Sequence, residues 1–457
     1  MKRRVMEQLL LFGSVLKWTF YASIVGAAVG LSTTVFLKTL AWATGIALAH
    51  PSYYLWLPVT LLVSAVLVRW LAPDAEGHGT ERVIAALHER AGRIPLAVVP
   101  VKLVATVITL AGGGSAGKEG PCAQIGAGIA SALASLGRIP DVERRKLVIC
   151  GVSAGYAAVF GTPIAGALFG VEVLFLGQLL YDVLLPSFVA GITAYHVSSA
   201  LGVKYFHFSL DVFPAFTERV FGQMLLLGVW CGIGALLLIE ALRFGHNVFQ
   251  RLRWWKPFNA VLGGALLTGI GGFVSTRYLG LGLNSIEDGL RGQVLAKSAF
   301  FWKLIATAIT LSCGGSGGIV TPIFFLGTSA GNLFSTLFST GNVATYSAIG
   351  MVALLAGAAN TPIAASVMAI ELFGPGVAPH AAIACIVAFL MSGHRSVYPS
   401  QVLSILKSGS LTATTGKAMN QVEHGDVSSQ FKLPGFLNRL FRRYRLQKSG
   451  QCQNKKE

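Results

Sequence analysis

The sequence predicts an all-α, polytopic membrane protein, and three observations support this fold class. Hydrophobic residues make up 53% of the 457 residues, whereas charged residues make up only 12%, against roughly a quarter in an ordinary soluble domain. The mean hydropathy is +0.64. Apolar runs interrupted by glycines fill most of residues 8–405. A soluble core of this length would need far more polar surface, so we expect most of the chain to lie in a membrane.

Many of the apolar runs are too short or too broken to be simple spans. Clear runs lie near 9–48, 54–72, 96–111, 147–200, 220–243, 258–280, 299–312, 322–338, 344–358 and 380–392. Several hold fewer than the roughly 20 residues that a full span needs. Irregular backbone is tolerated at membrane depth only where it is buried in protein or lines a cavity. The pattern is therefore typical of tilted, partly broken helices in a transport protein.

The whole chain has a formal net charge of +17, and basic residues concentrate at its two ends. The chain begins MKRRV, and its tail beyond Lys432 is rich in arginine and lysine. By the positive-inside rule we expect both termini to be cytoplasmic in a multi-pass protein of the cytoplasmic (inner) membrane, with the basic ends contacting anionic lipid. Nucleic-acid binding is the minor alternative and is not predicted, because no folded domain surrounds the basic tail. The first apolar run is too long for a signal peptide.

Residues that could hold a metal or a cofactor form no recognisable pattern. The six cysteines are scattered without a CxxC pair. The nine histidines show no ligand spacing. We therefore predict free, mostly buried thiols, no metal site and no cofactor.

The chain repeats itself. Residues 102–121 (KLVATVITLAGGGSAGKEGP) match 303–322 (KLIATAITLSCGGSGGIVTP) at an offset of 201, with 12 of 20 positions identical. A second pair, TPIAGALFGVE at 162–172 and TPIAASVMAIE at 361–371, has an offset of 199. Repeats in membrane transporters indicate a transport site at the interface between the halves. The predicted segments are a basic N-terminus (1–9), transmembrane repeat 1 (10–202), a linker (203–218), transmembrane repeat 2 (219–405) and a basic tail (406–457).

The stretch GGGSAGKEGP at 112–121 begins like a nucleotide-binding Walker A loop. However, Glu119 follows Lys118 where that loop needs Ser or Thr. The second copy has Ile319 and Val320 at the two equivalent positions, so it would lose the phosphate-binding lysine. No strand–loop–helix unit of a soluble domain surrounds either copy. We therefore do not predict nucleotide binding.

Each copy of the two motifs contains a proline that follows a small residue. The four pairs are Gly120-Pro121, Thr162-Pro163, Thr321-Pro322 and Thr361-Pro362. Proline is favoured at the first helical position after a Thr or Gly cap, so four helices should start at these prolines. Helix starts that converge inside a membrane present unpaired N–H groups and positive dipole ends, which together can bind an anion. The alternative is that the small residues only permit close helix packing.

Glu119 is the acid that most suggests a function, because an ionisable group within an apolar span is costly. At a predicted helix start, its carboxylate would compete with a transported anion for the same donors, and protonation would release it. Glu119 is therefore a candidate gate, proton carrier or both. The alternative is a carboxylate that only caps the helix and pairs with Lys118.

Two further kinds of charged residue recur in both repeats. Glu172 and Glu371 each stand nine residues after a proline, and we predict that they bond loop N–H groups rather than transport protons. Lys102 and Lys303 begin the repeated motif. We predict a structural role in which their ammonium groups snorkel to water, although they would also raise the potential for an anion.

Taken together, these motifs resemble those of the CLC chloride channel and transporter family, over about residues 10–405. GKEGPCAQIGAGIAS (117–131) resembles the G-[KR]-E-G-P signature, and GIVTP (318–322) resembles the GxFxP motif. EGHGT (76–80) falls where the GSGIP loop belongs, and Tyr398 falls where the pore tyrosine belongs. The tail is too short for the paired nucleotide-sensing domains of many members, so the resemblance is to the bacterial type.

The resemblance implies two inverted halves of tilted helices, and a homodimer with one pore per subunit. It implies that Glu119 is the external gating glutamate. The residues that it places at the anion are Gly77, His78, Gly79, Ile319, Val320 and Tyr398. The residues that it places in the supporting loops are Gly117, Lys118, Gly120, Pro121, Gly318 and Pro322.

Three positions depart from the family pattern. His78 replaces the usual central serine, which suggests a pH-sensitive inner gate or an altered anion preference; the alternative is a solvated histidine that leaves the backbone of Gly77 and Gly79 to bind the ion. Glu81 stands where proline is common. Val173 stands where proton-coupled members often carry an internal proton-transfer glutamate, which puts proton coupling in doubt.

We therefore predict a non-enzymatic transporter that moves chloride or a similar small anion, passively or against protons. One rival is a fluoride exporter of the same family, whose members also depart from the central serine, although His78 is not the methionine expected there. A rival of another class is an intramembrane enzyme that uses Glu119 and His78 as an acid–base pair. The second repeat carries no comparable pair, which argues against the enzyme.

Overall fold

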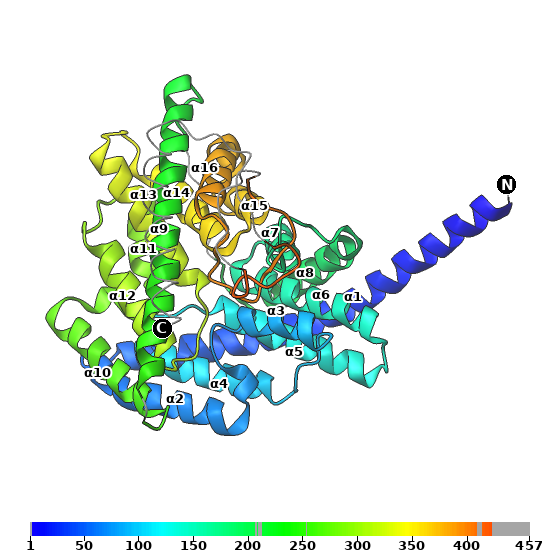
Figure 1. Cartoon of the computed structure of the whole chain (residues 1–457), viewed down its shortest axis with the longest axis horizontal. Coiled ribbons are helices and arrows are strands. Elements are labelled where there is room, and N and C mark those ends of the chain that lie inside the picture. Colours follow the sequence, from blue (N-terminus) through cyan, green and yellow to red (C-terminus); the bar gives the residue numbers. More distant parts are fainter. Residues whose placement is uncertain (1, 206–207, 209–212, 253, 409–413, 423–457) are drawn as a thin grey trace, which may run out of the picture.

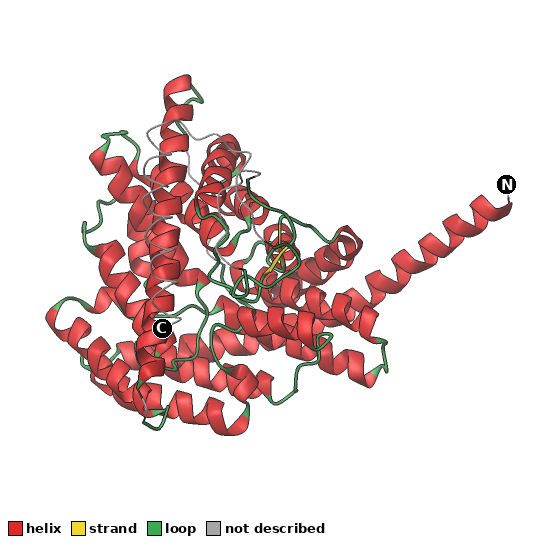
Figure 2. Cartoon of the chain, in the orientation of Figure 1, coloured by secondary structure: helices red, strands yellow, loops and turns green. Residues whose placement is uncertain are grey.

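The computed structural model describes residues 2–205, 208, 213–252, 254–408 and 414–422, and within them the predicted all-α class is confirmed (Figure 2). The first eight α-helices are α1 (Lys2–Leu48), α2 (Leu57–Leu71), α3 (Thr80–Glu89), α4 (Val98–Ala111), α5 (Glu119–Leu136), α6 (Asp141–Phe160), α7 (Pro163–Glu172) and α8 (Tyr181–Ala200). The next eight are α9 (Glu218–Arg251), α10 (Phe258–Phe273), α11 (Leu283–Leu290), α12 (Ala299–Ser312), α13 (Val320–Leu337), α14 (Val343–Ala359), α15 (Pro362–Phe373) and α16 (Ala378–Met391). The only strands in these residues are β1 (Phe175–Leu176) and β2 (Val402–Leu403), which pair in parallel.

The two halves are related by reciprocal contacts. The Gly117 N–H donates to the Gly318 carbonyl at 2.7 Å, and the Gly318 N–H donates to the Gly117 carbonyl at 2.6 Å. Two hydroxyl pairs flank this bridge, each at 3.0 Å: Thr106–Ser316 and Ser115–Thr307. A twofold relation produces such pairs, because the contact from the first half to the second is repeated from the second half to the first. The sequence repeat therefore corresponds to a twofold axis through the glycine loops.

The lengths of the helices agree with the prediction of broken spans. In the part of the chain that the structure describes, four helical segments could cross a membrane by length and composition: Arg3–Leu48, Tyr53–Leu71, Tyr181–Ala200 and Glu218–Arg251. Shorter apolar helices such as α12 and α14 hold 14 and 17 residues. Every residue of α14 from Thr345 to Ala359 is buried, so this short helix is surrounded by protein. The irregular backbone at its end is thereby kept away from lipid.

The predicted helix starts are correct at two of the four prolines. α7 and α15 begin at the predicted prolines, but α5 begins at Glu119 and α13 at Val320, each two residues before its proline. Proline is tolerated at this third position because the first four N–H groups of a helix have no intrahelical partner. The predicted caps of α7 and α15, Thr162 and Thr361, do stand at the N-cap, but neither side chain makes a capping hydrogen bond.

The ends of the chain differ in how far the structure describes them. α1 is one continuous helix whose first turns project from the body, so the predicted boundary between 1–9 and repeat 1 falls inside a helix (Figure 1). Between the repeats, α8 ends at Ala200 and α9 begins at Glu218. The basic part of the tail beyond Lys432 lies outside the described residues.

Candidate functional site

Three segments singled out in the sequence converge where the halves meet. Gly79 has φ +81°, and a Cβ on it would meet the Gly120 carbonyl. A Cβ on Gly120 would in turn meet the His78 carbonyl and would lie 3.0 Å from the Gly318 Cα. Only glycine permits backbones to approach this closely. The 77–79 loop therefore packs directly against the start of α5, which in turn packs against Gly318 in the loop before α13.

Glu119 points across the twofold interface rather than at its own helix. Its carboxylate is buried, with the residue 2% exposed. One oxygen accepts the Thr321 backbone N–H at 3.1 Å, and the other accepts the Thr321 hydroxyl. Because Thr321 lies in the first turn of α13, the donors come from the other repeat, which corrects the expectation that they lie at the start of α5. No ion pair joins Glu119 to Lys118 in the part of the chain that the structure describes.

The start of α13 is thus a site for negative charge. Unpaired N–H groups and the positive end of the helix dipole stabilise an anion there. In this structure the carboxylate of Glu119 occupies that position. A small anion could use the same donors only if the carboxylate left.

A cluster of three hydroxyl groups lies beside this site. Tyr398 is buried, at 1% exposed, and its hydroxyl lies near those of Tyr156 and Thr80. The Thr80 and Tyr156 oxygens are 2.6 Å apart. Glu119 is close enough to act electrostatically on both tyrosines. Hydroxyl groups can donate to an anion or pass a proton, because each is both donor and acceptor.

Sequence reasoning identified Tyr398 but missed the other polar groups of the site. Thr321 lies inside the recognised GIVTP motif, and Thr80 directly follows the glycines of EGHGT, so both had a local signal. Tyr156 lies in a run of small and apolar residues, where nothing in the sequence distinguishes a pore hydroxyl from a core aromatic side chain.

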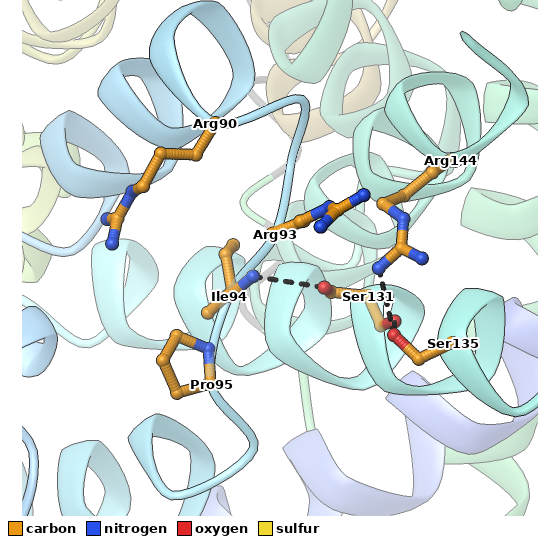
Figure 3. A pocket seen from close by; sticks show the side chains of 7 residues that line it. All are labelled: Arg90, Arg93, Ile94, Pro95, Ser131, Ser135 and Arg144. Atoms are coloured by element: carbon orange, nitrogen blue, oxygen red, sulfur yellow. Dashed lines mark hydrogen bonds between the residues drawn. The ribbon is translucent and has the colours of Figure 1, made fainter. Parts of the chain in front are cut away.

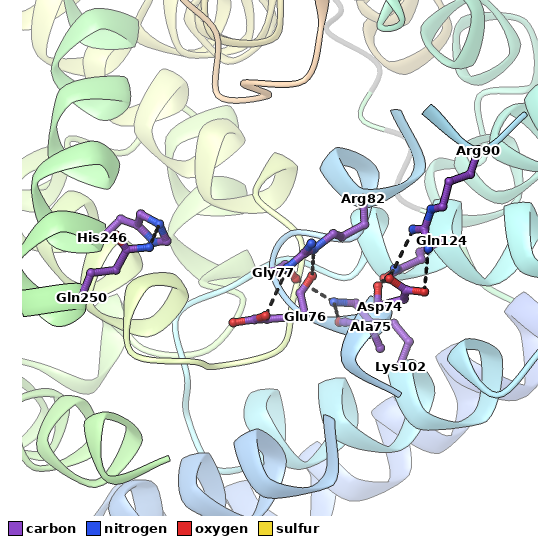
Figure 4. A network of polar contacts seen from close by, with 10 residues as sticks. All are labelled: Asp74, Ala75, Glu76, Gly77, Arg82, Arg90, Lys102, Gln124, His246 and Gln250. Atoms are coloured by element: carbon purple, nitrogen blue, oxygen red, sulfur yellow. Dashed lines mark hydrogen bonds and ion pairs between the residues drawn. The ribbon is translucent and has the colours of Figure 1, made fainter. Parts of the chain in front are cut away.

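Lys102 holds the 73–79 loop from inside the protein (Figure 4). Its ammonium donates to the carbonyls of Ala75 at 2.9 Å and Gly77 at 2.7 Å, and the residue is 0% exposed. The prediction that it snorkels to water is therefore wrong. Buried carbonyls replace water as its acceptors, because the loop folds over the end of the side chain.

Lys303 occupies the equivalent place in the second repeat. It is also 0% exposed, and its ammonium donates to the carbonyls of Tyr278 at 3.3 Å and Gly280 at 2.8 Å. Snorkelling is wrong here too, whereas the predicted structural role agrees with these contacts. The two lysines therefore make equivalent contacts in the two halves of the protein.

Glu172 and Glu371 also form a reciprocal pair, and the predicted bonding to N–H groups is confirmed. The Glu172 carboxylate accepts the N–H groups of Ile363 at 3.1 Å and Ala364 at 2.7 Å. The Glu371 carboxylate accepts those of Ile164 and Ala165 at the same two distances. Each acid thus satisfies the first turn of the partner helix, α15 or α7.

His78 and Val173 occupy the two positions where the family pattern changes. His78 is partly exposed, and its Nδ1 is buried without a hydrogen-bond partner among the described residues. The Val173 side chain is buried, and its carbonyl accepts the Gln401 amide at 3.0 Å. Neither position supplies an acid to the site.

A pocket of about 530 Å³ opens on a basic face of the protein (Figure 3). It is lined by Arg90, Arg93, Ile94, Pro95, Ser131, Ser135 and Arg144. Arg90 pairs with Asp74 at 3.0 Å, and Arg93 pairs with Asp141 at 3.0 Å. α3 and α5 both start at the candidate site and end beside this pocket. The basic face therefore lies at the far ends of these two helices.

Metal-binding geometry is not found among the described residues, where no three His, Cys, Asp or Glu side chains gather. The five described cysteines are buried and free, as predicted. Cys452 lies outside the described residues.

Comparisons with known proteins give a consistent result. A family model described as voltage gated chloride channel matches residues 59–393. A protein of Pseudomonas syringae pv. tomato named chloride/fluoride channel protein is 36% identical over 410 residues, which cover 88% of this chain and 89% of the relative.

Solved structures extend the similarity to the fold. A CLC-type fluoride/proton antiporter superposes with a TM-score of 0.81 at 30% identity, covering 85% of this chain and 98% of that one. A slow cyanobacterial Cl⁻/H⁺ antiporter superposes with a TM-score of 0.73 at 22% identity, covering 82% and 94%. The second likeness concerns the fold alone.

Proposed function

Because the chain belongs to the voltage-gated chloride channel family, a family of anion-transporting membrane proteins, we propose that it exports fluoride in exchange for protons, with Glu119 as gate and proton carrier. The observation that carries this proposal is the docking of the Glu119 carboxylate on the Thr321 N–H and hydroxyl. An ionised carboxylate takes the donors that an anion needs. A protonated one is a poorer acceptor and leaves them free.

The choice of fluoride over chloride rests on the relatives and on the donors. The sequence alone favoured chloride, but the relative named for chloride and fluoride and the neighbouring fluoride/proton antiporter favour fluoride. The hydroxyls of Thr80, Tyr156 and Tyr398 agree with this choice, because a small, strongly accepting anion gains most from O–H donors.

The remaining anion ligands follow from the same arrangement. The Tyr398 hydroxyl and the backbone N–H groups at Ile319 and Val320 coordinate the central ion, and the Gly77–Gly79 loop forms the inner end of its path. His78 adjusts the anion preference of that inner end, since its Nδ1 has no hydrogen-bond partner among the described residues. The loops at Gly117, Gly120 and Gly318 supply the close backbone packing.

Orientation and assembly are part of the proposal. The basic face around Arg90, Arg93 and Arg144 faces the cytoplasm by the positive-inside rule, and both termini lie on that side of the inner membrane. Lys17 on α1 contacts Glu143 at 2.6 Å, which brings the N-terminal helix to this face. Two subunits associate, each with its own pore.

Selective efflux tests the proposed substrate. Proteoliposomes containing the purified protein are loaded with potassium fluoride or potassium chloride, and initial efflux is followed with ion-selective electrodes. We expect fluoride efflux to exceed chloride efflux by at least about tenfold, equivalent to about 1.4 kcal/mol of discrimination. Chloride efflux as fast as fluoride efflux would contradict fluoride selectivity. A folded protein that moves neither anion would contradict transport and favour the enzyme with Glu119 and His78.

A further inference from the structure

Glu81 is a partly buried acid at the edge of the hydroxyl cluster, and it makes no contact with Glu119 among the bonds described above. It is the second residue of α3 and directly follows Thr80. One carboxylate oxygen, Oε1, accepts the Ser400 N–H at 3.0 Å and the Ser400 hydroxyl at 2.5 Å. The other oxygen, Oε2, is buried and has no hydrogen-bond partner among the described residues. Buried polar atoms are nearly always paired, so an unpaired carboxylate oxygen indicates a proton or a role.

Charged groups near Glu81 do not explain this oxygen. Arg82 is the adjacent cation, but it pairs with Glu76 at 3.1 Å at the surface. Glu89, at the other end of α3, carries the same charge as Glu81. Among titratable groups of other elements, Tyr398 is the one on which Glu81 acts electrostatically. Within the described residues, Glu81 therefore forms no ion pair.

The position of Glu81 connects the site to the basic face. Glu81 directly follows Thr80 and is bonded to Ser400, two residues after Tyr398, so it lies beside the hydroxyl cluster, and both Glu81 and Glu119 act electrostatically on Tyr398. From Glu81, α3 runs to Glu89 and then to the pocket of arginines. Eight residues of α-helix span about 12 Å, so α3 carries the chain about that far from Glu81 to Glu89.

We propose that Glu81 is the inner proton-exchanging acid of this transporter, and that it passes protons between the basic face and Glu119 through the hydroxyls of Thr80, Tyr156 and Tyr398. This proposal rests on the proposed exchange of fluoride for protons. A proton from water binds the free oxygen of Glu81. The new O–H donates it to a cluster hydroxyl, each hydroxyl passes its own proton to the next oxygen, and the last proton protonates Glu119. Glu81 is left as the carboxylate, and each hydroxyl regains its proton.

The proposal removes the difficulty that Val173 poses for proton coupling. Val173 offers a buried methyl surface and a carbonyl that is already bonded to Gln401, so it cannot exchange protons. Glu81 supplies an acid from a different helix, at the position where the sequence departs from the usual proline. The two departures from the family pattern then compensate for each other.

The test measures proton uptake and fluoride efflux in the same proteoliposomes for the wild type, Glu81→Gln and Glu89→Gln. Glutamine keeps an acceptor for Ser400 but cannot exchange a proton. We expect the ratio of protons to fluoride to fall at least about tenfold in Glu81→Gln while fluoride efflux continues. Glu89→Gln, altered at the far end of the same helix, should keep the wild-type ratio. A wild-type ratio in Glu81→Gln would overturn the proposal.

A second variant keeps the test decisive if Glu81→Gln does not fold. Thr80→Val removes the first hydroxyl of the path and keeps the volume of the side chain, so it should also lower the ratio of protons to fluoride. An unchanged ratio in folded Thr80→Val would overturn the relay. A wild type that moves fluoride without protons would refute the proposed exchange itself, which distinguishes that failure from the failure of Glu81 alone.

Discussion

The Thr321 hydroxyl should control how strongly the gate closes. Thr321→Val replaces the hydroxyl by a methyl group of similar size at a residue that is 1% exposed, and it leaves the backbone N–H in place. The Glu119 carboxylate therefore keeps one of its two donors. A hydrogen bond to a charged acceptor contributes about 1.5–3 kcal/mol. At about 1.4 kcal/mol per factor of ten, docking of the carboxylate should weaken about 10- to 100-fold.

The sign of the effect follows from what the carboxylate does at the site. The docked carboxylate occupies the donors, so weaker docking should raise fluoride efflux in Thr321→Val. Glu119→Gln has no carboxylate to dock, so adding Thr321→Val to it should leave efflux unchanged. Efflux from proteoliposomes is measured for the wild type, both single variants and the double variant. Wild-type efflux in Thr321→Val, or a double variant that is faster than Glu119→Gln, would refute the reasoning.

Three further predictions concern the framework of the site. Lys102→Met and Lys303→Met should both lower the thermal unfolding midpoint, because each variant leaves two carbonyls without a donor at a cost of about 1–3 kcal/mol apiece. Only Lys102→Met should also slow fluoride efflux, so equal efflux in the two variants would contradict this prediction. Glu172→Gln and Glu371→Gln should each lose about 1.5–3 kcal/mol of stability, seen as similar drops in the unfolding midpoint, with the ratio of protons to fluoride unchanged; a changed ratio would assign them to transport. Gly120→Ala should reduce efflux at least about tenfold, because its methyl group would overlap the 77–79 loop; normal efflux would mean that the loops can separate.

Much of the framework could be predicted because it repeats. Glu172 and Glu371 recur at matched positions, and a residue that recurs in both halves of a twofold structure is expected to do the same thing twice. The structure gives each of them two N–H groups of the partner half. The broken spans were predictable for a similar reason, since segment length and glycine content are local properties.

The errors came from contacts between distant segments. The sequence placed the donors of Glu119 at its own helix start, because a local pattern sees only the helix in which a residue lies, whereas the actual donor, Thr321, is 202 residues away. Snorkelling was expected for Lys102 because the rule assumes water beyond the helix end. The carbonyls that replace water there, on Ala75 and Gly77, belong to a loop 27 and 25 residues earlier.

The central claim, that Glu119 couples an anion to a proton, is tested most directly by following both ions at once. Proteoliposomes are given a fluoride gradient, and fluoride efflux and external pH are recorded together for the wild type and Glu119→Gln. The account predicts proton uptake in fixed proportion to fluoride efflux in the wild type, and fluoride efflux without proton uptake in Glu119→Gln. Wild-type fluoride efflux with no proton movement, or proton coupling that survives in Glu119→Gln, would contradict it.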